Sequence, residues 1–125
     1  KEYEHQARRI RKTFGGGMRQ AGYLAAAGLY ALENNISRLK EDHHRARVIE
    51  SALKKISWVK SVMPVKTNII VFHPLPSRET VLAKLKESNL LASKFMDQEI
   101  RIVTHLDFTD EMLQETISVL KELPF

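Results

Sequence analysis

The sequence lacks cysteine and has no long apolar run. None of its 125 residues is Cys, and only 7% are aromatic. Without cysteine there is no disulfide framework, no thiolate metal site and no cysteine nucleophile, and we expect a cytoplasmic location. The most apolar stretch, Leu24 to Leu32, is far shorter than the roughly 20 residues that crossing a bilayer requires. No apolar leader precedes Lys1, so we expect no signal peptide, no membrane partner and a start that has been cut.

Catalytic and metal-binding patterns are also scarce. His43 and His44 are adjacent and diverge by about 100° on a helix, while His5, His73 and His105 have no partner at ligand spacing. We therefore expect no metal. No Ser-His-Asp arrangement, H-E-x-x-H motif or nucleophile elbow occurs, and no motif pairs carboxylates for general acid–base work.

Positive charge is concentrated at one end of the chain. The net charge is +5, and residues 1–19 alone carry six basic side chains against two acidic ones, whereas the rest is nearly neutral. This excess favours an anionic partner for the N-terminal end, although a solvated basic helix face gives the same pattern. Trp58 and the tyrosines are scattered, so no aromatic platform supports nucleic-acid binding.

The apolar pattern predicts an α+β fold. Helical spacing predicts a helix up to Lys12, a buried helix from about Met18 to Leu32, and an amphipathic helix that follows a break at Asn34 and Asn35. Extended patterns predict strands over 59–64, 67–74 and 99–104, with a short extended piece before the last strand. Cap residues predict two further helices, which begin after Ser77 and Thr109. The expected architecture is a small sheet with helices packed on it and a long helix or helix pair leading in.

The stretch FGGGMRQ sets three glycines, Gly15 to Gly17, before a strongly helical segment. A glycine turn that opens a helix presents free backbone N–H groups at the positive end of the helix dipole, and Lys12 and Arg19 add charge. This predicts a phosphate site, and a flexible connector explains the same residues equally well. The spacing fits neither the phosphate loop of nucleotide-binding proteins nor the dinucleotide fingerprint.

Arg101 lies in the predicted strand EIRIVTH. Alternation places Ile100 and Ile102 on one face and Arg101 on the other, with Glu99 and Val103. An arginine amid apolar neighbours needs an anionic partner, and its planar fork suits a carboxylate. An internal salt bridge near Glu99 or to Asp107 is the simpler interpretation from the residues alone.

Four segments together resemble threonine aldolases in the same order, and the resemblance covers about Ala7 to Leu120. They are RRIRKTFGGGMRQAGYLAAAGLYALENN, EDHHRAR, TNIIVF and IRIVTHLDFTDE. The resemblance is to the C-terminal part of that family. It implies the small C-terminal domain of a fold-type-I pyridoxal-phosphate enzyme, a lyase that cleaves L-threonine or L-allo-threonine to glycine and acetaldehyde and is a homo-oligomer.

The resemblance also implies roles for three residues. Arg101 resembles the arginine that binds the substrate carboxylate. Of the two expected cofactor-binding residues, Arg19 resembles an arginine near the cofactor phosphate, and Lys12 resembles a basic position of the family's active-site region. The lysine that forms the Schiff base in the family lies upstream of Lys1, so this chain holds no catalytic residue, and we expect it to bind no cofactor and to be inactive alone. We expect residues 1–34 to belong with a large domain and residues 35–125 to form the small domain.

Two other classes of function fit parts of the sequence. A free-standing module could bind nucleic acid or another polyanion through the basic end. An oligomerisation domain could use the alanine-rich face of residues 21–32, where small side chains let helices approach closely. The second of these is compatible with a threonine aldolase.

Overall fold

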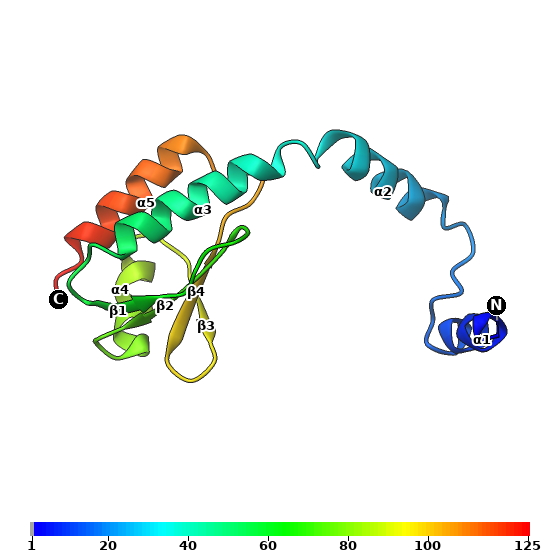
Figure 1. Cartoon of the computed structure of the whole chain (residues 1–125), viewed down its shortest axis with the longest axis horizontal. Coiled ribbons are helices and arrows are strands. Elements are labelled where there is room, and N and C mark those ends of the chain that lie inside the picture. The colour runs from blue at the N-terminus through cyan, green and yellow to red at the C-terminus, as the bar shows by residue number, and fades with distance from the viewer. Residues whose placement is uncertain (1) are drawn as a thin grey trace. The chain divides into compact units, whose positions relative to one another are not determined.

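A computed structural model describes residues 2–125, and Lys1, part of the predicted basic end, lies outside the described residues. Nine elements follow one another along the chain: α1 (Glu4–Thr13), α2 (Gly22–Asn34), α3 (Leu39–Leu53), β1 (Val59–Val62), β2 (Ile69–Pro74), α4 (Arg78–Glu87), β3 (Ser93–Phe95), β4 (Glu99–Val103) and α5 (Asp110–Glu122) (Figure 1). The order confirms the predicted α+β class.

The four strands form one antiparallel sheet in the order β1-β2-β4-β3. The two central strands pair in a register that sets Ile70 opposite Ile102 and Val71 opposite Arg101. The central position of β2 explains its continuous apolar run, because consecutive residues on both faces of the strand, Ile70, Val71 and Phe72, are all buried. The predicted extended piece is β3, which pairs with β4 at the edge.

One face of the sheet carries the hydrophobic core. Ile70, Phe72, Ile100 and Ile102 contribute from the strands, and helices α3, α4 and α5 supply the apolar side chains packed against them, among them Ile49, Leu53, Val81, Leu85 and Leu120. Figure 1 shows α3 and α5 side by side, and the two helices are in contact. The alternation in β4 therefore leaves Arg101 on the opposite face, as predicted.

The predicted helix starts after β2 and β4 are confirmed. The Ser77 hydroxyl accepts a hydrogen bond from the Thr80 amide, and the Thr109 hydroxyl accepts one from the Met112 amide. Each bond satisfies one of the free donors of a first helical turn. The predicted break after Asn34 is also present, since α2 ends there and α3 begins at Leu39.

The chain divides into two compact units, one ending at Ser37 and the other spanning Arg38–Phe125. In the first unit every residue from 2 to 34 is exposed, so the prediction that α2 is a buried helix is wrong for this chain. Its apolar side chains, such as Leu24 and Leu29, have no covering partner among the described residues of the unit. No helix within residues 2–125 is long and apolar enough to cross a membrane.

The glycine turn ends α1, as predicted, but it does not directly open the next helix. The amides of Gly15 and Gly16 donate to the carbonyls of Lys12 and Arg11, closing the C-terminus of α1, and Gly15 has the left-handed φ of +81°. Helix α2 begins at Gly22, later than the predicted start near Met18. The intervening residues form bends and a turn, with Gln20 also at positive φ.

Candidate functional site

Arg101 lies in the middle of the sheet face that bears no core helix. Strand register sets it beside Val71 of β2 on one side and Ser93 of β3 on the other. Its side chain is half-buried, so the charge sits where water only partly screens it. Such a place strengthens any contact with an anion.

The guanidinium of Arg101 is held by β3 and, within residues 2–125, by no carboxylate. Its Nε donates to Ser93 Oγ at 3.2 Å, and its Cζ lies 5.9 Å from the centre of the Phe95 ring. No acidic side chain of residues 2–125 comes within ion-pair distance of it, which leaves the internal salt bridge to Glu99 or Asp107 without support. The Arg101 fork is therefore available to an external anion.

Glu99, the acidic residue on the same face, contacts another partner. Its carboxylate lies 3.8 Å from Nδ1 of His73, which stands across from it on β2. That distance is too long for a direct hydrogen bond. Glu99 therefore lies beside β2 and, among the pairs within residues 2–125, forms none with Arg101.

The predicted cofactor-binding residues lie in the other unit. Lys12, at the end of α1, and Arg19, between α1 and α2, are exposed, and neither forms an ion pair with an acidic side chain of residues 2–125. The amides of Gly15 and Gly16 are already used in closing α1, so they offer no open cradle. What this segment presents to a phosphate is side-chain charge.

A buried carboxylate that the sequence analysis missed organises the second unit. Asp42 is 3% exposed and accepts two hydrogen bonds of 3.1 Å from the guanidinium of Arg38. Arg45 lies 3.9 Å from the same carboxylate and donates to Asp110 at 2.7 Å, a bond that raises the pKa of Arg45. The EDHHRAR segment thus ties α3 to the start of α5.

The same network reaches the end of β4. The buried hydroxyl of Thr104 donates to the backbone carbonyl of Asp42 at 2.8 Å. Asn68, just before β2, donates its side-chain amide to the Thr104 carbonyl at 2.7 Å. Three residues after Arg101, the chain is therefore fixed to both α3 and β2.

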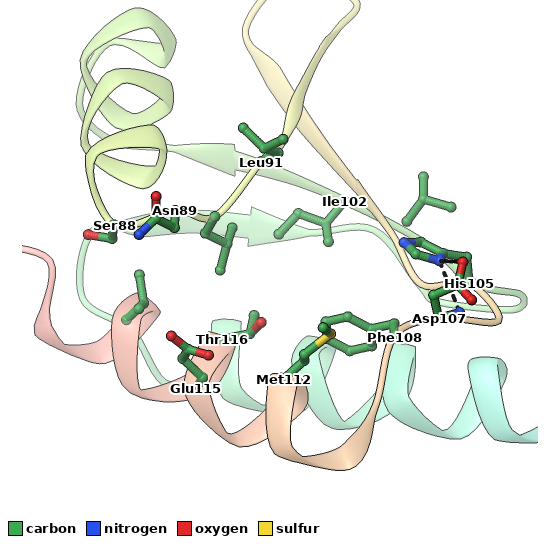
Figure 2. A pocket seen from close by; sticks show the side chains of 13 residues that line it. Ser88, Asn89, Leu91, Ile102, His105, Asp107, Phe108, Met112, Glu115 and Thr116 are labelled. Carbon is green, nitrogen blue, oxygen red and sulfur yellow. Dashed lines mark hydrogen bonds and ion pairs between the residues drawn. The ribbon is translucent and has the colours of Figure 1, made fainter.

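A cavity of about 500 Å³ lies between β4, α5 and the loop after α4. Figure 2 shows Leu91, Ile102, Phe108 and Met112 lining it. Arg101 is not among its lining residues. His105 and Asp107, at one end, interact with each other, and no metal-binding cluster occurs among residues 2–125.

The family model of the beta-eliminating lyases matches residues 1–74, more than half of the chain. The chain belongs to the beta-eliminating lyase family. The matched part of the chain includes Lys12, Arg19, Asp42 and His73, and Arg101 lies beyond it.

Two curated relatives extend the match over nearly the whole chain. It is 40% identical over 116 residues to the low specificity L-threonine aldolase of Escherichia coli K12, covering 92% of this chain and 34% of the relative. It is 35% identical to a probable low-specificity L-threonine aldolase 2 of Arabidopsis thaliana, covering 98% of this chain and 36% of the relative. The chain spans about a third of the length of these relatives.

A solved structure shows the same fold. A C-DES mutant with glycine covalently linked to its PLP cofactor matches with a TM-score of 0.64 at 16% identity, over 83% of this chain and 29% of that one. The chain thus shares its α+β fold with part of that PLP-linked protein.

Proposed function

We propose that this chain is the C-terminal part of a threonine aldolase, here called the parent enzyme, which cleaves L-threonine or L-allo-threonine to glycine and acetaldehyde. The single observation that carries the proposal is the similarity to L-threonine aldolases, which reaches 40% identity. The similar region covers 92% of the chain and includes Arg101. The fold agrees with this assignment, since it is that of a pyridoxal-phosphate enzyme.

Arg101 is the proposed substrate-binding residue. Its fork has no carboxylate partner among residues 2–125, and an amino-acid substrate supplies one. Two parallel charge-assisted hydrogen bonds would fix both the position and the rotation of the substrate about its carboxylate. In a retro-aldol cleavage the bond between Cα and Cβ breaks as the β-hydroxyl loses its proton. The hydrogen bonds from Arg101 to the carboxylate would keep that bond aligned for cleavage.

Pyridoxal phosphate is the proposed cofactor of the parent enzyme. When bound, it supplies the electron sink that takes up the electron pair left on Cα. Lys12 and Arg19 fit its phosphate by charge, and we propose that they contribute to holding it, within one subunit or across a subunit boundary. We further propose that the chain alone binds no cofactor and is inactive, and that the parent is a cytoplasmic homo-oligomer.

The test is an assay of the parent enzyme, which is this chain together with the coding sequence upstream of Lys1. The parent with pyridoxal phosphate should release acetaldehyde from L-threonine, L-allo-threonine or both, and the 125-residue chain should not. Arg101→Gln should raise KM about ten- to hundredfold, the equivalent of one lost charge-assisted hydrogen bond of roughly 1.5–3 kcal/mol. Arg47→Gln, which removes an exposed arginine of α3, is the matched control. A parent that releases no acetaldehyde from either amino acid contradicts the proposal.

No observation favours the nucleic-acid alternative. The basic N-terminal segment lies within the part matched by the lyase family. Salt-dependent binding of the chain to DNA or RNA, with a slope that reflects several phosphate contacts, would be needed to revive it.

A further inference from the structure

Arg101 receives two contacts from the neighbouring strand β3. Ser93 Oγ accepts the Nε hydrogen bond at 3.2 Å, and the Phe95 ring lies 5.9 Å from Cζ. The Ser93 hydroxyl also donates a hydrogen bond to the backbone carbonyl of Arg101 at 3.3 Å. One contact therefore acts in the plane of the guanidinium, and the other is with an aromatic ring at cation–π distance.

These contacts decide which edge of the guanidinium is free. A guanidinium binds a carboxylate side-on through Nε and one Nη, or end-on through the two Nη groups. Ser93 occupies Nε, and no protein acceptor in residues 2–125 takes a hydrogen bond from either Nη of Arg101. The end-on edge is left for a ligand.

The strand that supplies the contacts is itself anchored. Arg78, in the first turn of α4, donates to the Met96 carbonyl at 2.9 Å in the turn between β3 and β4. Glu79 lies 3.4 Å from the Lys94 ammonium on β3. An edge strand of three residues would otherwise be free to fray, so α4 keeps Ser93 and Phe95 in place.

We propose that Ser93 and Phe95 are positioning residues that orient Arg101 for end-on binding of the substrate carboxylate. The proposal rests on the proposed function, because it takes Arg101 as the group that binds the substrate. The position of Glu99 supports the proposal. Alternation places this carboxylate on the same face of β4 as Arg101, but it lies 3.8 Å from Nδ1 of His73 and is not paired with Arg101.

The first experiment measures kinetics of the parent enzyme. Ser93→Ala should raise KM about two- to tenfold, as expected for loss of one hydrogen bond, with kcat changed less than twofold. Ser93→Thr keeps the hydroxyl and should restore KM. Phe95→Leu should raise KM by a smaller factor. Ser61→Ala, in the other edge strand β1, is the matched control and should have no effect.

A double-mutant cycle separates positioning from a general structural role. In the Arg101→Gln background, Ser93→Ala should cause no further rise in KM, because the group that Ser93 orients is gone. An equal rise in both backgrounds would show that Ser93 acts independently of Arg101, and the proposal would be wrong.

The second experiment needs no catalysis. In the 125-residue chain, the side-chain Nε–H resonance of Arg101 should shift and exchange faster with water in Ser93→Ala than in the wild type or Ser61→Ala. An inactive parent would overturn the proposed function, and this resonance would still decide whether Ser93 fixes Arg101. An unchanged resonance in Ser93→Ala, or an unchanged KM in an active parent, would overturn the inference.

Discussion

At the scale of single residues, Asp42 and Arg101 show opposite ways of placing a charge. Asp42 is 3% exposed and fully engaged, with Arg38 and Arg45 on either side along α3. Arg101 is half-buried, and within residues 2–125 its guanidinium makes one hydrogen bond, through Nε, besides its contact with the Phe95 ring. A satisfied buried charge serves the fold, whereas a partly free one is suited to a ligand.

Replacing Asp42 should destabilise the second unit. Asp42→Ala leaves the half-buried guanidinium of Arg38 without its acceptor and removes the negative charge that lies 3.9 Å from Arg45, and the expected loss is about 1–3 kcal/mol of unfolding free energy. Both arginines keep partial contact with water, with side chains 18% and 14% exposed, which limits the loss. Urea unfolding followed by Trp58 fluorescence measures it. Asp97→Ala, at an exposed position, is the control, and an equal midpoint for the two variants would contradict the prediction.

At the scale of elements, Glu50 of α3 contacts both Lys54 at the end of the helix and the backbone of Val65 in the loop after β1. Lys54 donates to Glu50 at 2.7 Å, and this bond, together with the backbone amide of Val65, holds the pKa of Glu50 below its usual value. A depressed carboxyl pKa stabilises the folded state above the unfolded pKa, about 4.3, and this contribution is lost as pH falls through the folded value.

The resulting prediction concerns Glu50→Gln. At pH 7 this variant should have a lower urea midpoint than the wild type, and at pH 3 the difference should be smaller, because the stabilisation from the Glu50 carboxylate is lost as pH falls toward its lowered folded-state pKa. Lys54→Gln removes the largest cause of the pKa shift and should give part of the same effect. A difference that stays constant between pH 7 and pH 3 would show that the charge of Glu50 is not responsible.

At the scale of the whole molecule, stability resides in one of the two units. All residues of the hydrophobic core cluster lie between Ala46 and Leu123, and residues 2–34 are exposed throughout. Short helices without a buried face are marginal in water, so α1 and α2 add little to the cooperative unit in this chain.

Deleting residues 1–37 should therefore leave the unfolding transition unchanged. The remaining chain, 38–125, keeps the whole core and the Asp42 network, and its urea midpoint and slope should match those of the 125-residue chain. Circular dichroism provides a second check on the retained helices. A lower midpoint or a loss of cooperativity would show that the first unit contributes to the core.

Local pattern was enough to predict most elements of the second unit. The strands, the caps Ser77 and Thr109, and the face that carries Arg101 follow from alternation and from hydrogen bonding within one turn, which are properties of neighbouring residues. The burial predicted for the helix from about Met18 to Leu32 was wrong because burial requires a partner, and the described chain supplies none. The apolar composition of α2 is still typical of a helix that packs against a partner.

The sequence by itself determined the fold class, the family resemblance and the identity of Arg101 as a candidate carboxylate-binding residue. Only the tertiary structure decided that Ser93 and Phe95 contact Arg101 and that Glu99 lies beside His73. It also decided that Asp42 of α3 contacts Thr104 and, through Arg45, Asp110 at the start of α5. It also decided that the glycine amides close α1 and leave no open cradle. The physical reason is that strand register and helix packing bring together residues far apart in sequence, and periodicity along the chain does not contain those distances.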